Sequence, residues 1–226
     1  MEANLFKIMH MRIKRTIDAL AKNNIKAVYV PTASDARSLL ETMLVEGETI
    51  GVGGSVTLNQ INALELLRSG KYNFLDRYAP GLSKDDVFEI QRKALLSDTF
   101  ITSSNAITEH GELYNVDANS NRVSAMLFGP KRVIVIAGQN KIVPDLEHAV
   151  VRVKTTAAPA NSIRLDCDTF CAKNGHCLRP VCDDSSIMAI PAGACPNTIC
   201  CNSVVMGRQR REGRVFVIIV GEDLGY

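Results

Sequence analysis

The hydrophobic residues of this chain follow two spacings in turn, one typical of helices and one typical of buried strands. Apolar residues near the N-terminus recur at a helical period, which predicts a helix over residues 3–23. A short apolar run ended by proline, Lys26–Pro31, predicts the first strand. Further helices are predicted from Ser34 to about Val45, after Ser55 to Arg68, from near Asp85 to about Ser97, over 121–127, and from Pro144 to about Ala157. Further strands are predicted at 48–52, 73–76, 99–103, 113–116, 132–137 and 214–220.

Strands that alternate with helices predict an α/β fold with a mostly parallel sheet flanked by helices. At 226 residues the chain suits one domain, and we assign residues 1–226 to it. The alternation stops at Pro159, and the stretch that follows is rich in Cys, Pro, Asp and Asn. We therefore interpret residues 159–213 as an irregular, cysteine-rich insertion before the last strand.

Composition excludes several classes of protein. The net charge is only +2, and the basic run 208–214 has no interleaved aromatic residues, so no nucleic-acid partner is expected. No run of about 18 apolar residues occurs, so no membrane partner is expected. Charged residues interrupt the apolar part of the N-terminal segment, which indicates an amphipathic helix and not a signal peptide. We expect a cytoplasmic protein, whose cysteines would be thiols or metal ligands.

A glycine-rich turn, Gly51–Ser55, lies between a predicted strand and a predicted helix. Glycine lets the backbone approach a ligand, and free N–H groups at such a turn can bind an anion. Gly53, Gly54 and Ser55 are therefore candidates to bind a phosphate or carboxylate. The dinucleotide fingerprint GxGxxG is absent. The alternative is a tight turn without a ligand.

A second candidate region is the polar stretch from Thr102 to Val143, which follows two further predicted strands and would reach the same sheet edge. Glu109 and Glu112 are its candidate catalytic carboxylates, as base or nucleophile. Alternatively, Glu109 only pairs with Arg122 or Lys141 and holds the loop. The candidate ligand-binding residues of this stretch are Asn105, Asn115, Asp117, Asn121, Arg122, Asn140 and Lys141. The two cations could bind a carboxylate or phosphate, whereas the asparagines could instead brace turns.

All seven cysteines lie between Cys167 and Cys201, and scattered core cysteines would not segregate in this way. No CxxC pair occurs, so the spacing matches neither a zinc ribbon nor a ferredoxin run. Thiolates from one irregular loop still suit zinc or an iron–sulfur cluster. Reduced structural thiols and redox-active pairs remain the alternatives.

The polar stretch also resembles the LUD domain of lactate-utilisation proteins. The matching motifs are SNAIT-E-G-x-L-x-N-x-D-x-x-x-N-R-V, FGPK-x-V-I-V and G-x-N-K-I-V, together with the closing GEDLGY. The resemblance implies a fold like that of the NagB/RpiA/CoA-transferase group. It also implies a role in the oxidation of L-lactate to pyruvate, with oxidoreductase partner subunits.

Short members of that family carry a cysteine pattern whose positions here are Cys171, Cys177, Cys182 and Cys200. These four are the candidate metal ligands, with an iron–sulfur cluster favoured over zinc because of the family's redox association. Thr198 stands where the family usually has arginine, and Cys167, Cys195 and Cys201 are additional.

Three functions follow. The first is a part in the oxidation of lactate or a related hydroxy acid. The second is a stand-alone enzyme of the isomerase or CoA-transferase type, which binds a small carboxylate or phosphate-bearing ligand. The third is a non-catalytic metal or ligand sensor. A homodimer is compatible with each of them.

Overall fold

Six parallel strands form the main sheet of the protein, in the order β1-β10-β7-β4-β2-β3. The computed structural model describes residues 3–178 and 195–226. The strands of this sheet are β1 (Lys26–Val30), β2 (Thr49–Val52), β3 (Asn73–Phe74), β4 (Thr99–Thr102), β7 (Arg132–Gly138) and β10 (Val215–Val220). The predicted α/β class, with a mostly parallel sheet flanked by helices, is confirmed.

A second sheet of four strands was not predicted as a unit. Its order is β8-β5-β6-β9, and its strands are β5 (Ala106–Thr108), β6 (Leu113–Asp117), β8 (Ile142–Val143) and β9 (Asn202–Met206). Strand β9 pairs antiparallel with β6, from Leu113 opposite Met206 to Asp117 opposite Asn202. The stretch 159–213 is therefore not irregular throughout, which corrects the sequence interpretation. Its short strand has a half-exposed edge pattern that did not stand out from its polar neighbours.

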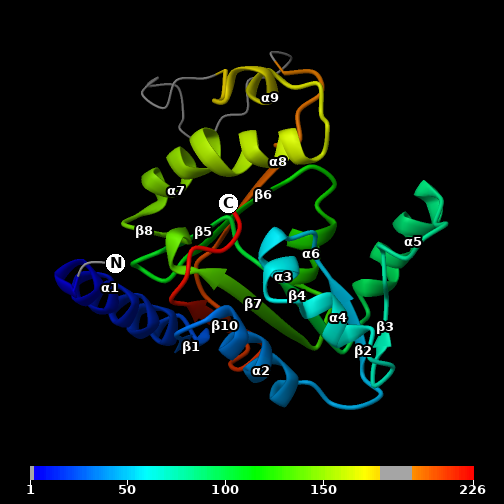
Figure 1. Cartoon of the computed structure of the whole chain (residues 1–226), viewed down its shortest axis with the longest axis horizontal. Coiled ribbons are helices and arrows are strands. Elements are labelled where there is room, and N and C mark those ends of the chain that lie inside the picture. The colour runs from blue at the N-terminus through cyan, green and yellow to red at the C-terminus, as the bar shows by residue number, and fades with distance from the viewer. Residues whose placement is uncertain (1–2, 179–194) are drawn as a thin grey trace.

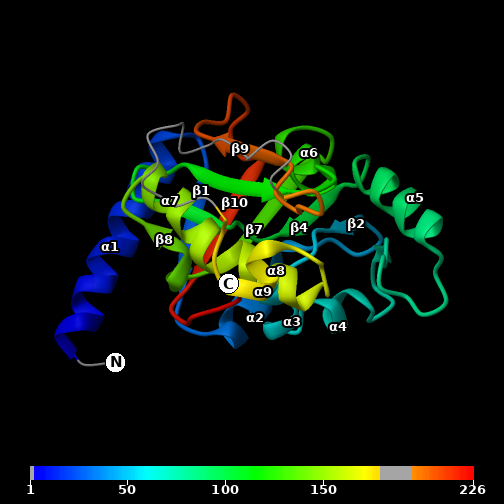
Figure 2. The same ribbon diagram turned by 90° about the horizontal axis from the view of Figure 1, so that it is seen from above.

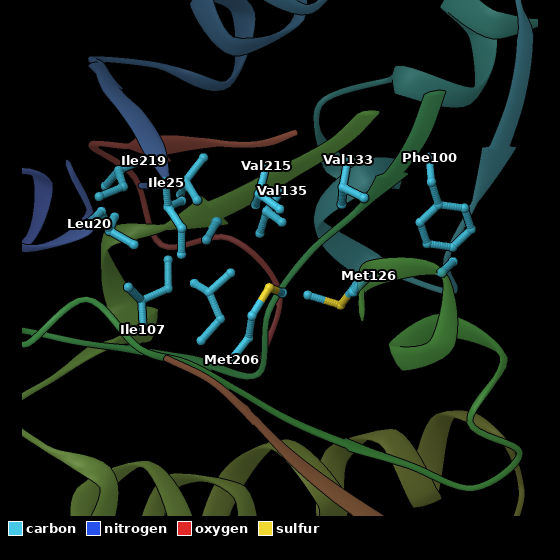
Figure 3. Close-up of a cluster of buried hydrophobic side chains, with 14 of the residues drawn as sticks. Leu20, Ile25, Phe100, Ile107, Met126, Val133, Val135, Met206, Val215 and Ile219 are labelled. Atoms are coloured by element: carbon cyan, nitrogen blue, oxygen red, sulfur yellow. The ribbon is translucent and has the colours of Figure 1, made fainter. Parts of the chain in front are cut away.

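The two sheets and their helices form layers (Figure 1). One face of the main sheet packs against α2 (Ala33–Met43), α3 (Val56–Gln60) and α4 (Ala63–Leu67). The other face packs against the small sheet, α1 (Ala3–Lys22) and α6 (Asn121–Leu127), and Figure 3 shows the apolar side chains between them. Helix α7 (Leu146–Arg152) covers the outer side of the small sheet. Figure 2 shows α1 and α5 (Lys84–Ala94) at opposite ends of the molecule.

Two helices differ from the sequence prediction. The helix predicted to end at Arg68 is broken into α3 and α4, because Asn62 adopts a left-handed backbone with φ of 54°. The helix predicted to end near Ala157 continues through a π-helical turn, Val153–Ala157, into α8 (Ala158–Arg164). Pro159 directly follows the π-helical turn, and the helix continues through it, so the end predicted there is wrong. A further helix, α9 (Phe170–Asn174), follows.

The parallel arrangement brings several chain segments to one edge of the main sheet. Strands β2, β4, β7 and β10 all end at this edge, and the residues after them are Gly53, Ser103, Gln139 and Gly221. Their loops therefore meet beside α8 and the small sheet. Among the described residues, none of the helices is long and apolar enough to cross a lipid bilayer.

Candidate anion-binding pocket and cysteine cluster

A polar pocket of about 140 Å³ opens at the edge where the parallel strands end. Its described lining comes from the turns after β2 and β4, the end of β6, and helices α6 and α8. The C-terminal residues Gly225 and Tyr226 complete it, and both views place this end of the chain beside α8 (Figures 1 and 2). The predicted ligand-binding residues that line the pocket are Gly54, Ser55, Asn105, Asp117, Arg122 and Lys141.

Lys141 is the most unusual side chain of the pocket. It lies in a short 3-10 turn after β7 and is only 3% exposed. Its ammonium Nζ donates to the hydroxyls of Ser103 at 2.9 Å and Thr57 at 3.0 Å. Burial, with a smaller contribution from the charges of Arg152 and Arg122, lowers the pKa of Lys141 to about 7. Among the residues that the structure describes, no carboxylate pairs with this ammonium.

Arg122 organises the opposite part of the pocket. Its guanidinium donates to both the Asp117 carboxylate, at 2.6 and 2.9 Å, and the side-chain oxygens of Asn115 and Asn105, at 2.6 and 3.0 Å. It also donates to the backbone oxygens of Ser103 and Val116. Asp117 accepts a further bond from the Val123 amide and so anchors α6. Both charged side chains are almost buried, at 12% and 11% exposure.

Three more predicted ligand-binding residues hold the backbone around the pocket. Gly53 leaves room for its neighbours, because a Cβ there would lie 2.5 Å from the Thr102 hydroxyl and 3.2 Å from Arg122. Asn140 binds the C-terminal segment, accepting from the Leu224 amide and donating to the Gly225 carbonyl. Asn115 is 1% exposed and accepts from Arg122. The asparagines at 105, 115 and 140 therefore brace turns and loops, as the alternative interpretation held. Asn121, the remaining predicted ligand-binding residue, is the first residue of α6 and does not line the pocket.

The net charge of the pocket favours an anion. Its described lining contains three cationic side chains, Lys141, Arg122 and Arg164, against one carboxylate side chain, Asp117, which Arg122 neutralises. Arg152 adds a charge close by, where it donates to the carbonyls of Asn105 and Asn140. Burial lowers the pKa of Arg152 from its ordinary value. Of the two remaining cationic side chains in the lining, Lys141 is buried and Arg164 is exposed, so the attraction for a carboxylate or phosphate is strongest at Lys141.

The two candidate catalytic glutamates lie in the β5–β6 hairpin and do not line this pocket. Glu109 accepts from Arg12 at 2.7 Å and from Arg15 at 2.7 Å, both on α1. The interpretation in which Glu109 pairs with Arg122 or Lys141 is therefore wrong. The hydroxyl of Thr108 donates to the Glu112 carboxylate within the hairpin turn. The structure thus brings neither glutamate together with Lys141.

Replacing Glu109 by glutamine is expected to loosen the contact between α1 and the hairpin without affecting the pocket. The two arginines are partly or largely exposed, at 24% and 61%, so the loss of unfolding free energy should be about 1 kcal/mol. Chemical denaturation and titration with lactate measure the two effects. A loss of ligand affinity with unchanged stability would instead give Glu109 a functional role.

Sequence reasoning missed several pocket residues. Ser103 and Ser104 follow β4, and their place after a buried strand was a usable signal. Asn161, Arg164 and Tyr226 gave no such signal, because their approach depends on the π-helical turn and on the path of the C-terminal segment.

Four cysteines line a separate, mostly apolar pocket of about 70 Å³ between α8, α9 and the small sheet. They are Cys171, Cys177, Cys195 and Cys200. Three of them match the resemblance, Cys195 is additional, and the fourth predicted ligand, Cys182, lies outside the described residues. Burial, with a smaller contribution from the nearby Cys171 and Cys177, raises the pKa of the Cys200 thiol to about 12.

The donor chemistry of this cluster suits a soft metal, but its geometry does not form a complete site. Within residues 3–178 and 195–226, no three Cys, His, Asp or Glu side chains lie close enough together to hold a metal ion. The six described cysteines are all free thiols. We therefore derive no chemical step through a metal centre.

Comparison with known proteins shows the family from a sequence model and the fold from a solved structure. The family model described as "LUD domain" matches residues 13–220. The chain is also similar to a solved crystal structure of a DUF162 family protein from Deinococcus radiodurans. The TM-score is 0.50 and the sequence identity 16%, over 94% of this chain and 98% of that chain. At this identity the likeness shows the fold alone. A search of curated proteins finds no match.

Proposed function

This chain belongs to the LUD domain family, and from that premise we propose that its polar pocket binds lactate or a related small hydroxy acid. The observation that carries the proposal is the buried Lys141 ammonium, which has no carboxylate partner among the described residues. A buried charge is costly unless it is paired. The carboxylate of a bound hydroxy acid would supply the missing partner.

The proposed role is binding and orientation of the acid. Oxidation of a hydroxy acid to a 2-oxo acid breaks one O–H and one C–H bond, forms a C=O bond, and releases two electrons and two protons. The electrons need an acceptor, which we assign to an oxidoreductase partner subunit. The chain alone is therefore expected to bind both acids without interconverting them.

The affinity for lactate is expected to fall as the pH rises. Lactate stays an anion across this range, whereas free Lys141 loses its proton near pH 7. Binding should be fully present below that pH and weaken by up to about tenfold per pH unit above it. Isothermal titration calorimetry at pH 6, 7 and 8 measures this trend. Lactamide, which has no charge, is the ligand control, and it should bind poorly at every pH.

The result that would contradict this proposal is equal affinity for lactate and lactamide, or lactate binding that is unchanged in Lys141→Met. Residual binding by that variant should not vary with pH, because it has no titrating group at this position. A pH trend that persists in the variant would assign the effect to another group.

We also propose that Cys171, Cys177 and Cys200, with Cys182 or Cys195, bind an iron–sulfur cluster or, alternatively, zinc. The described thiols are too far apart for this in the present structure, so the proposal requires that they move together when the metal binds. When bound, an iron–sulfur cluster would supply electron transfer beside the pocket. Protein purified without oxygen is expected to absorb near 400 nm and to contain iron and acid-labile sulfide. Zinc without sulfide would give the cysteines a structural role. Metal-free protein with free thiols would remove the metal proposal and leave the pocket unaffected.

A second candidate function is a stand-alone enzyme that acts on a phosphate-bearing small molecule. The observation that favours it is the Gly54–Ser55 turn in the pocket wall, where a Cβ on Gly54 would meet only the Tyr78 hydroxyl, at 3.5 Å. A backbone with this much free space can approach a phosphate closely. Tighter binding of inorganic phosphate than of lactate in the same titrations would favour this candidate.

A further inference from the structure

The side chain of Lys141 is able to react as well as to carry a charge, because part of the protein holds it as a neutral amine near pH 7. Its pKa is lowered from 10.5 to about 7, mainly by burial. At pH 7 roughly half of the molecules therefore carry the neutral form, against about one in three thousand for an ordinary lysine. A neutral lysine amine is a nucleophile that attacks carbonyl groups, whereas an ammonium is not.

The hydrogen bonds of Lys141 leave the lone pair of the neutral amine free. Its Nζ donates to the hydroxyl oxygens of Ser103, at 2.9 Å, and Thr57, at 3.0 Å. The Thr57 hydroxyl directs its own hydrogen to the Leu224 carbonyl, at 3.4 Å. A neutral amine has two hydrogens, and the two hydroxyls accept both of them. Within the described part of the chain, no group donates to the nitrogen. Because Lys141 and Ser103 line the polar pocket, a bound ligand can reach this nitrogen.

The charges around Lys141 favour a carboxylate next to its nitrogen. The positive charges of Arg152 and Arg122 act on Lys141. Both guanidinium groups are held in place, Arg152 by two backbone carbonyls and Arg122 by Asp117. They disfavour a third positive charge and stabilise a negative one. In a 2-oxo acid the carboxylate carbon is bonded directly to the carbonyl carbon. A 2-oxo acid whose carboxylate lies here therefore brings an electrophilic carbon next to Nζ.

We propose that Lys141 forms an imine with 2-oxo acids, so that the pocket holds the keto product of hydroxy-acid oxidation by a reversible covalent bond. This inference rests on the proposed function, since it assumes that the pocket admits a small acid. A hydroxy acid has no carbonyl carbon and is held by charge alone. The imine would thus let one site bind substrate and product in different ways.

The step needs no oxidant or reductant. The neutral Nζ attacks C2 of the oxo acid, a C–N bond forms, and the electron pair of the C=O bond moves to the oxygen, which takes one amine proton. The C–O bond then breaks, the nitrogen lone pair forms the C=N bond, and the oxygen leaves as water with the second amine proton. The hydroxyl of Ser103, at 2.9 Å from Nζ, is close enough to relay these protons. Protonation of the imine nitrogen by solvent completes the adduct.

The test is reductive trapping of the intact chain with pyruvate and sodium cyanoborohydride at pH 7. The reagent reduces the protonated imine to a stable secondary amine, and peptide mass spectrometry locates it. The adduct is expected on Lys141, at least tenfold above any other lysine, because the neutral fraction of Lys141 is roughly a thousandfold larger. Lactate in place of pyruvate should give no adduct, and excess lactate should slow the labelling by pyruvate.

Variants separate the nucleophile from the charge. Lys141→Arg keeps a positive charge but has no neutral form near pH 7, so it should bind lactate and give no adduct. Lys141→Met should give neither. The matched control is Lys131→Met, which removes a lysine that is 77% exposed and should leave the labelling of Lys141 unchanged. The peptide map of the wild-type protein decides the question without any variant, should Lys141→Arg fold poorly.

Each outcome bears on the inference or on the proposed function separately. Lactate binding by calorimetry with no adduct on Lys141 would overturn the inference and leave the proposed function standing. Adducts spread evenly over the exposed lysines would overturn it as well. An adduct on Lys141 without lactate binding would support the imine and reject binding of the hydroxy acid. With neither an adduct nor lactate binding, both proposals fail.

Discussion

Replacing Lys141 by methionine is expected to abolish lactate binding and, at the same time, to stabilise the folded protein. The wild-type ammonium is 3% exposed and is held by two hydroxyls, with no carboxylate among the described residues. Methionine has a similar length and fills the same space without a charge. The protein would lose its anion partner and also lose the cost of burying a cation.

The sign and pH window of the stability gain follow from the pKa of Lys141. That pKa is lowered from 10.5 to about 7 in the folded protein. Below pH 7 the folded state must carry a buried charge, so the variant gains most there, by up to about 5 kcal/mol at about 1.4 kcal/mol per pKa unit. Between pH 7 and 10.5 the unfolded wild-type chain binds the extra proton, so wild-type stability rises with pH and the gain shrinks.

Chemical denaturation of both proteins at pH 6.5, 8 and 9.5 measures this difference. Lys14→Met, at an exposed position of α1, is the matched control and should stay close to the wild type at each pH. A Lys141→Met protein that is less stable than the wild type at pH 6.5 would show that the ammonium is paired in the native protein.

Replacing Arg122 by methionine is expected to cause a large loss of stability, about 3–5 kcal/mol of unfolding free energy. The Asp117 carboxylate is 11% exposed and would lose its charged partner at 2.6 Å. The oxygens of Asn115 and Asn105 would each lose a donor as well. Most of the expected cost is that of leaving these buried acceptors without their bonds.

Chemical denaturation of the single and double variants separates the contribution of the Arg122–Asp117 ion pair to the free energy of unfolding from that of the other Arg122 hydrogen bonds. Adding Asp117→Asn to Arg122→Met removes the unpaired charge and should recover part of the loss. Lys131→Met is the matched control, because Lys131 is 77% exposed and its pair with Asp98 is expected to contribute at most about 1 kcal/mol. Similar losses in Arg122→Met and Lys131→Met would contradict the proposed role of Arg122.

The main sheet could be predicted from the sequence because its central strands are continuous apolar runs. Strands β7 and β10 bury almost every residue, so their pattern needs no knowledge of their neighbours. Strand β9 could not be predicted in this way, since only Met206 is buried and its pairing with β6 supplies the rest of its stability. The break between α3 and α4 likewise depends on one left-handed residue, Asn62, in an otherwise helical pattern.

The pocket was predicted in part for a similar reason. Residues that directly follow parallel strands must meet at one edge, so Gly54, Asn105 and Lys141 could be grouped from the sequence. Glu109 is only four residues beyond Asn105, yet it lies in a hairpin that turns away from the pocket toward α1. Spacing along the chain cannot show this, because the direction of a hairpin is set by its pairing and its packing.

The most direct test of the central claim is the pKa of Lys141, measured by NMR from the pH dependence of its ¹³Cε chemical shift. Lys141→Met assigns the signal, since it should be missing from that variant. We expect a midpoint near pH 7 in the free protein and a clear upward shift with saturating lactate, because the bound carboxylate stabilises the ammonium. A midpoint near 10.5 that does not respond to the ligand would contradict the account.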